Sequence, residues 1–158
     1  MPRDPQAPLR FVHKLAAPVA GAEVDLTPRG LGDWRIMNLA LSLVTSATVA
    51  NRTITLTADD GTDVYFRAPA IASQAASLTG LYTAYEGSDA ETLVAGEVTL
   101  GWPDHGLWLP QGAHLRTQTD LIEVDDQYGA VVALVEEYPY GPDGPRVPSA
   151  SLYTPTLG

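Results

Sequence analysis

Residues 52–66, RTITLTADDGTDVYF, restrict the fold of this chain more than any other stretch of its sequence. Threonines alternate with apolar residues over 53–58, and after a break the alternation resumes over 64–67. Such period-two alternation is typical of a β-strand that has one face in water. Between the two runs lies DDGT, in which Gly61 can adopt the positive φ that a tight hairpin turn requires. The segment therefore predicts a β-hairpin.

The same alternation predicts further strands along the chain. We expect them at residues 20–26, 34–45, 74–85, 97–101, 107–109, 114–119 and 129–138. Leu39, Leu41 and Leu43 share one face of their strand. Ile36 is out of phase with them, which predicts a bulge near Asn38. Residues 129–138 are apolar on both faces, which predicts a central strand covered on two sides.

Helical periodicity is missing from the sequence. Apolar residues do not recur at helical spacing for three turns anywhere, and residues 88–94 are expected to form one short helical turn at most. Many short strands without intervening helices predict an all-β protein that folds as a sandwich or a barrel. We expect a single domain, an antiparallel β-sandwich of about eight strands with jelly-roll topology.

Both ends of the chain are rich in proline. Prolines at positions 2, 5 and 8, and again at 139, 142, 145 and 148, recur every three residues, which matches the repeat of polyproline II. The sequence therefore predicts an extended N-terminal arm at residues 1–18, the jelly-roll sandwich at 19–138 and an extended, proline-rich C-terminal arm at 139–158.

The side chains of the C-terminal arm cannot order it alone. Fixing about 20 residues costs on the order of 20–40 kcal/mol, whereas burying its five large apolar side chains contributes roughly 8–15 kcal/mol. The arm therefore needs other surface, most economically that of a neighbouring subunit; the alternative that it wraps its own domain stays open. The predicted partner-contact residues of the two arms are Pro2, Arg3, Pro5, Pro8, Tyr140, Arg146, Val147, Leu152, Tyr153 and Leu157.

The charge of the chain excludes several classes of partner. The formal net charge is −10, from 19 acidic and nine basic residues. An acidic surface of this kind repels phosphate backbones and anionic membrane surfaces, so we expect neither nucleic-acid nor membrane binding. The longest apolar stretch, residues 36–44, is too short to span a bilayer, and the N-terminus lacks the apolar run of a signal peptide.

Residues that carry catalysis or bind metal ions are sparse. There are no cysteines, and His13, His105 and His114 lack the spacing that places two imidazoles on one metal ion. The sequence has no Gly-x-Ser-x-Gly nucleophile motif. We therefore expect no enzymatic activity and no cofactor, and a cupin-like metalloenzyme stays open only as a second alternative.

Two further groups of residues have both a structural and a ligand-binding interpretation. Acidic residues gather at 120–126 and 59–63, but neither stretch has the register of a calcium-binding loop, so solvated turns are expected and a calcium site is the alternative. Trp102 and Trp108 flank a loop rich in Gly and Pro, where exposed rings could stack on sugars. Packing at the rim of the sandwich is expected for these tryptophans, with glycan binding as the alternative.

Four stretches of the sequence resemble a known group of proteins. They are LVTSATVANR at 43–52, ITLTADDG at 54–61, LPQGAHL at 109–115 and DDQYGAVVALVEEY at 125–138. Through them, residues 34–138 resemble the small jelly-roll virion proteins encoded in the structural gene clusters of tailed bacteriophages. The resemblance implies a decoration or cement protein, present in many copies on the outer surface of the capsid.

The resemblance also implies partners. A decoration protein binds the major capsid protein and neighbouring copies of itself, so a homo-oligomer is expected, with a trimer as the natural guess for a threefold position. The acidic surface, the arms and the lack of catalytic motifs agree with such a role. The first alternative is a component of the tail or of a head fibre that binds host glycans through Trp102 and Trp108.

Overall fold

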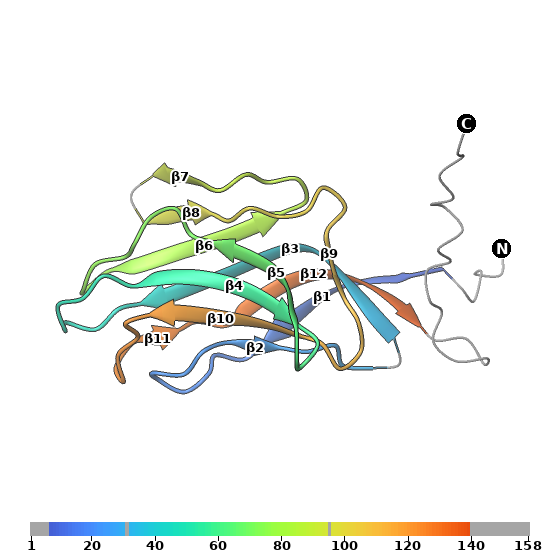
Figure 1. The fold of residues 1–158 in the computed structure, drawn as a ribbon, viewed down its shortest axis with the longest axis horizontal. Coiled ribbons are helices and arrows are strands. Elements are labelled where there is room, and N and C mark those ends of the chain that lie inside the picture. The colour runs from blue at the N-terminus through green and yellow to red at the C-terminus, as the bar shows by residue number, and fades with distance from the viewer. Residues whose placement is uncertain (1–6, 31, 95, 140–158) are drawn as a thin grey trace.

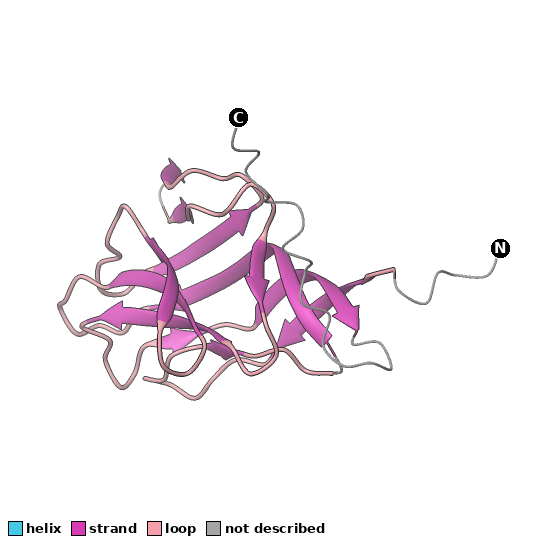
Figure 2. Ribbon diagram, turned by 45° about the vertical axis from the view of Figure 1, so that its right-hand side comes forward, coloured by secondary structure: helices cyan, strands magenta, loops and turns pink. Residues whose placement is uncertain are grey.

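The computed structural model describes residues 7–30, 32–94 and 96–139. Within these residues the protein contains twelve β-strands and no helix, and two sheets pack face to face (Figures 1 and 2). One cluster of buried apolar side chains fills the space between the sheets. The all-β sandwich predicted from the alternation is confirmed.

The first sheet is the larger of the two. Its main order is β1 (Leu9–Leu15), β12 (Val131–Pro139), β3 (Gly32–Val44), β6 (Thr79–Tyr85), β8 (Glu97–Thr99) and β7 (Glu91–Val94); β9 (Leu107–Leu109) and β11 (Gln127–Tyr128) also pair with β3. The second sheet consists of β2 (Asp25–Leu26), β10 (His114–Asp120), β4 (Thr53–Asp59) and β5 (Val64–Pro69), in that order. Every pair of these strands is antiparallel except β6 with β8.

The strand order is that of a jelly roll. Without the short strands β7, β8, β9 and β11, the remaining strands numbered one to eight along the chain form the sheets 1-8-3-6 and 2-7-4-5. Consecutive strands alternate between the sheets except at the hairpin of β4 and β5, which turns at Gly61 with a φ of 94°. This is the double Greek key of jelly rolls, so both the predicted topology and the predicted hairpin are confirmed.

Strand β3 shows how alternation produces the core. Leu39, Leu41 and Leu43 are all buried between the sheets, as predicted. The pairing of β3 with β12 skips Met37, next to the bulge predicted near Asn38. Local alternation therefore identified both the inward face of this strand and its irregularity.

The N-terminal arm is shorter than predicted. Residues 9–15 form β1, which pairs along its whole length with β12, and Phe11 and Leu15 pack against the core. The prediction of an arm at 1–18 is wrong for this segment, because proline spacing predicts an extended backbone but not whether it has a partner strand. Pro8 is exposed just before β1. The other predicted arm contacts fall within 1–6 and 140–158, outside the described residues.

Smaller predictions also need correction. The strand expected at 20–26 is reduced to β2, the strand expected at 74–85 begins only at Thr79, and β7 lies within the segment for which a helical turn was expected at most. Strand β12 is central in its sheet as predicted, but its outward face is not covered as predicted, since Val132 is 40% exposed. Apolar residues on both faces here indicate an apolar surface and not a strand buried on two sides.

Candidate functional site

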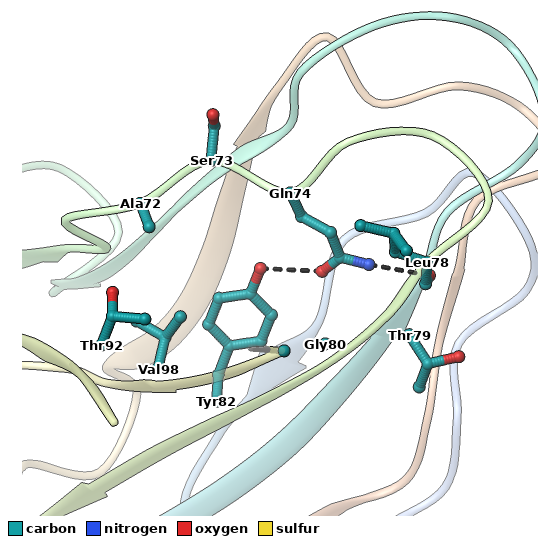
Figure 3. Close-up of a pocket in the computed structure, with 10 residues that line it drawn as sticks. Ala72, Ser73, Gln74, Leu78, Thr79, Gly80, Tyr82, Thr92 and Val98 are labelled. Carbon is teal, nitrogen blue, oxygen red and sulfur yellow. Dashed lines mark hydrogen bonds between the residues drawn. The ribbon is translucent and has the colours of Figure 1, made fainter. Parts of the chain in front are cut away.

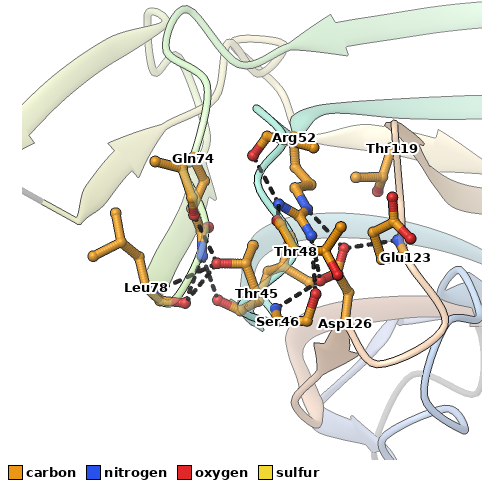
Figure 4. Close-up of polar contacts among 12 residues, drawn as sticks. Thr45, Ser46, Thr48, Arg52, Gln74, Leu78, Thr119, Glu123 and Asp126 are labelled. Carbon is orange, nitrogen blue, oxygen red and sulfur yellow. Dashed lines mark hydrogen bonds and ion pairs between the residues drawn. The ribbon is translucent and has the colours of Figure 1, made fainter.

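A buried ion pair links the loops at one end of the sandwich (Figure 4). The side chains of Arg52 and Asp126 are fully buried, with Arg52 Nε 2.8 Å from Asp126 Oδ2 and Nη2 3.0 Å from Oδ1. The other guanidinium hydrogens are donated to the carbonyl oxygens of Thr48 and Ala50 and to the hydroxyl of Ser46. All five donors of this guanidinium therefore have acceptors inside the protein.

Each carboxylate oxygen of Asp126 accepts two hydrogen bonds. Besides the bonds from Arg52, the carboxylate accepts backbone hydrogens from Ser46 at 2.7 Å and from Glu123 at 2.9 Å. Burial alone would raise the pKa of Asp126, but its hydrogen bonds, those from Arg52 foremost, outweigh burial and lower the pKa to about 2. Because both charges are satisfied internally, this pair stabilises loops, and neither group is left to bind a calcium ion or a substrate.

The acidic residues of the β4–β5 turn also serve the turn itself. Asp59 Oδ1 accepts the backbone hydrogen of Gly61 at 2.9 Å. Asp60 Oδ1 accepts those of Thr62 and Asp63 at 2.9 and 2.8 Å. These contacts support the expected turn over the calcium alternative. In the part of the chain that the structure describes, no group of three or more His, Asp or Glu side chains is placed to hold a metal ion.

The three histidines belong to separate elements. His13 on β1 packs on the ring of Trp34 with centroids 4.8 Å apart, and burial lowers its pKa. His114 on β10 has its Nδ1 2.8 Å from Asp25 Oδ1, and His105 is exposed in the turn before β9. Nothing in this arrangement supports a cupin-like metal centre.

A neutral polar cluster adjoins the buried ion pair. The backbone of Gln74 pairs with that of Arg52. The Gln74 side-chain amide donates to the carbonyl oxygens of Leu43 and Leu78, both at 2.9 Å (Figure 4). Its Oε1 accepts the hydroxyl hydrogen of Tyr82 at 2.8 Å (Figure 3). Burial raises the pKa of Tyr82 to about 12, so the phenol remains protonated at physiological pH.

A cavity of about 330 Å³ lies beside this cluster, between the β5–β6 loop and strands β6, β7 and β8 (Figure 3). Its inner side is formed by the buried residues Gln74, Tyr82 and Val98, and the exposed Thr92 lies at its mouth. None of the residues that line it is charged. A Cβ on Gly80 would overlap Gln74 Oε1, so only glycine fits at this position.

Exposed apolar side chains lie on the two segments that form the mouth of this cavity. Ile71 and Leu78 belong to the β5–β6 loop, and Leu93 and Val94 belong to β7. More than half of the surface of each of these side chains is accessible to solvent. An apolar cavity with apolar surroundings fits an apolar group of a partner better than a polar substrate.

An ionic row crosses the outer face of the first sheet, the face turned away from the second sheet. It consists of Arg10 on β1, Glu136 on β12, Arg35 on β3 and Glu86 after β6. Arg10 pairs with Glu136, and Arg35 lies 3.3 Å from a carboxylate oxygen of each glutamate. The hydrogen bond from Arg10 is the main reason that the pKa of Glu136 lies below its ordinary value.

Beside the ionic row the outer face is apolar. A shallow groove of about 420 Å³ includes Val12, Ala40, Tyr85, Val132 and Leu134 in its lining. These residues come from β1, β3, β6 and β12, so the groove crosses four strands. Val12 is 66% exposed. Exposed apolar surface that spans several strands is typical of a protein contact.

The two tryptophans proposed as glycan contacts have different environments. Trp102 is buried, donates its indole hydrogen to the carbonyl oxygen of Ile36 at 3.0 Å, and meets the ring of Phe66 edge to face. The glycan alternative is therefore wrong for Trp102, because the ring fills the core. Trp108 is half-buried beside Arg35 of the ionic row, with its ring 5.1 Å from that of Tyr138.

Sequence reasoning missed the residues that organise the loop end of the sandwich. The only sequence signal for the ion pair is that Arg52 and Asp126 lie in two of the stretches that carry the resemblance, 43–52 and 125–138. Gln74 had no distinguishing signal, since its role depends in part on the carbonyl group of Leu43, which lies 31 positions away in the chain. The motifs of the resemblance are thus connected to each other by a structural contact.

The described part of the chain contains no helix long and apolar enough to cross a membrane. Comparison with known proteins identifies no relative: no protein family matches the chain, and neither a curated protein nor a solved structure is significantly similar to it. The functional argument therefore depends on the geometry described above and on the sequence.

Proposed function

We propose that the protein is a structural component of a bacteriophage virion that binds the outer surface of the capsid and stabilises the shell. The observation that carries the proposal is the exposed apolar groove across β1, β12, β3 and β6 of a jelly roll. A monomer in water gains nothing from such a groove, whereas a lattice protein can bury it against its neighbour.

The charge of the chain supports the outer side of the shell. With a net charge of −10, the protein is repelled by packaged DNA at short range but not by a protein surface that offers basic residues. The proposed partners are accordingly the major capsid protein and neighbouring copies of the chain, with a trimer as the proposed oligomer and with contacts from the C-terminal arm.

Capsids that lack the protein provide the test. Purified protein is added to them and the bound copies are counted after sedimentation; we expect saturable binding with hundreds of copies and greater resistance of the shell to heat. Val12→Asp in the groove should weaken binding at least tenfold. Val64→Asp, on the exposed edge strand β5 of the other sheet, is the matched control and should bind normally. The proposal is contradicted if the unchanged protein does not bind capsids, or if both variants lose capsid binding to the same extent.

A second candidate function has one specific observation in its favour. Trp108 and Tyr138 present two half-buried rings beside the guanidinium of Arg35, a combination that can stack on a sugar ring and bond its hydroxyl groups. A tail or head-fibre protein that binds host glycans would use this platform. A glycan array separates the two functions. Glycan binding that Trp108→Ala abolishes supports the tail or head-fibre function, whereas the absence of glycan binding supports the decoration protein.

A further inference from the structure

The cavity at the β5–β6 loop has little capacity for polar recognition. Both amide hydrogens of Gln74 are already donated, and Tyr82 donates its only hydrogen to Gln74. On the inner side of the cavity, the hydroxyl oxygen of Tyr82 and the second lone pair of Gln74 Oε1 are the remaining side-chain acceptors. Ser73, Thr79 and Thr92 add hydroxyl groups elsewhere in the lining. Because no charged residue lines the cavity, a matching ligand is an uncharged, largely apolar group that can also carry a hydroxyl.

The C-terminal segment 140–158 contains such a group. It has one acidic and one basic residue, Asp143 and Arg146, and no net charge from side chains. Leu152 and Tyr153 are adjacent in it and are flanked by small residues, in the sequence SASLYTPT. Large apolar side chains that insert into a partner's pocket dominate the binding energy of most interfaces.

We propose that this cavity receives Leu152 and Tyr153 of a second copy of the chain, so that copies join head to tail. This inference rests on the proposed function, in which the arms contact neighbouring subunits, and it names the receiving site. A contact between two different surfaces repeats from copy to copy and closes into a ring where the rotation allows it, as in the proposed trimer.

The position of the cavity favours a second copy over the chain's own segment. Pro139, where the segment begins, pairs with Gly32 at one end of β3, whereas Thr79 in the cavity lining pairs with Val44 at the other end. The two places are about 40 Å apart at the rise of a β-strand, and they lie at opposite ends of the sandwich in Figure 1.

A return of the chain's own segment along the outer face would cross the ionic row next to the end of β12. Covering this row with an uncharged segment would remove water from two carboxylates and two guanidinium groups. A segment from a second copy can enter the cavity from the opposite end of the sandwich without that cost.

Disulfide trapping tests the inference with no background from native thiols, because the chain has no cysteine. Copies with Thr92→Cys at the mouth of the cavity are mixed with copies that carry Thr154→Cys, oxidised, and analysed on a non-reducing gel. We expect a cross-linked dimer with one copy of each kind. Copies with Val64→Cys in place of Thr92→Cys are the matched control, since Val64 is also an exposed strand residue, and they should yield at least tenfold less dimer.

Equal dimer yields at positions 64 and 92 overturn the inference. So does a doubly substituted Thr92→Cys, Thr154→Cys chain that cross-links only within itself at high protein concentration. Adding Leu152→Ala and Tyr153→Ala to the Thr154→Cys copies should reduce the dimer at least tenfold. Capsid binding is measured separately. If the protein binds capsids but the cross-link does not form, the inference is overturned and the proposed function stands. If the cross-link forms but the protein does not bind capsids, the inference stands and the proposed function is overturned.

Discussion

Arg52 places a full positive charge where no water reaches it, and the protein surrounds that charge with the carboxylate of Asp126 and three further oxygen atoms. A buried ion pair of this kind does not necessarily stabilise a fold more than apolar packing would. Its effect here is to join the β3–β4 loop to the β10–β11 loop in one arrangement, since five donors must find five acceptors together.

Removal of one partner should therefore be costly. We expect Arg52→Met to lower the free energy of unfolding by about 3–5 kcal/mol, because it leaves the Asp126 carboxylate buried without a counter-charge. The measurement is urea denaturation at pH 7. Arg67→Met, at an exposed position on β5, is the control and should stay within about 0.5 kcal/mol of the unchanged protein. A similar small effect for both variants would contradict the role given to Arg52.

The same pair predicts how stability depends on pH. The pKa of Asp126 is lowered from 3.8 to about 2 in the folded protein, so its contribution is present above about pH 4 and is lost as the pH falls towards 2. Asp126→Asn lacks this ionisation. The difference in unfolding free energy between the unchanged protein and Asp126→Asn should therefore be largest above pH 4 and shrink below it, in urea titrations from pH 7 to pH 2. If the difference in unfolding free energy does not change with pH, the lowered pKa of Asp126 in the folded protein is refuted.

At the scale of elements, β1 shows the limit of reading local sequence. Residues 9–15 have the alternation of a strand, but they follow three prolines and were assigned to an arm. Only the pairing with β12 shows that they complete the first sheet. Phe11 points inward and meets Trp34 at a ring distance of 5.8 Å, whereas its neighbour Val12 faces water in the outer groove.

The two faces of β1 should respond differently to truncation. We expect Phe11→Ala to lower the free energy of unfolding by about 2–3 kcal/mol, because the half-buried ring leaves a space beside Trp34. Val12→Ala removes a side chain that is largely in water and should change stability by less than about 0.5 kcal/mol. Thermal or urea unfolding of both variants provides the measurement. Equal losses of stability would indicate that β1 does not have Phe11 facing the core and Val12 facing water.

At the scale of the whole molecule, the core is complete without the C-terminal segment that is proposed to contact partners. The described core is complete within residues 9–139, whereas the proposed contacts with partners involve the groove, the cavity and the segment 140–158. A change outside the core should therefore alter binding more than folding.

Deletion of residues 140–158 tests this separation. We expect the melting temperature to change by less than about 4 °C, equivalent to about 1 kcal/mol or less, while binding to capsids weakens at least tenfold. Calorimetry and the sedimentation assay measure the two effects on the same preparation. A large drop in melting temperature would mean that the segment belongs to the folding unit of its own chain.

Much of the fold was predictable because alternation is local. The period of two in 53–58 and in the three leucines of β3 identifies which side chains face the core, and the glycine of the DDGT turn determines where the hairpin reverses. The all-β class and the jelly-roll sandwich were also predictable from these short-range patterns, although the set of eight principal strands includes β1, which they did not predict.

The rest depended on contacts between distant residues, which no local pattern encodes. The pairing of Arg52 with Asp126 spans 74 positions, and the pairing of β1 with β12 joins the two ends of the described chain. The burial of Trp102 and the partial exposure of Trp108, which flank the same loop, follow from where that loop meets β3. The sequence by itself determined most of the strand segments, though not β1 or β7, and the apolar face of strands such as β3. Tertiary structure alone decided which apolar faces are covered, because burial requires a partner surface that lies elsewhere in the chain.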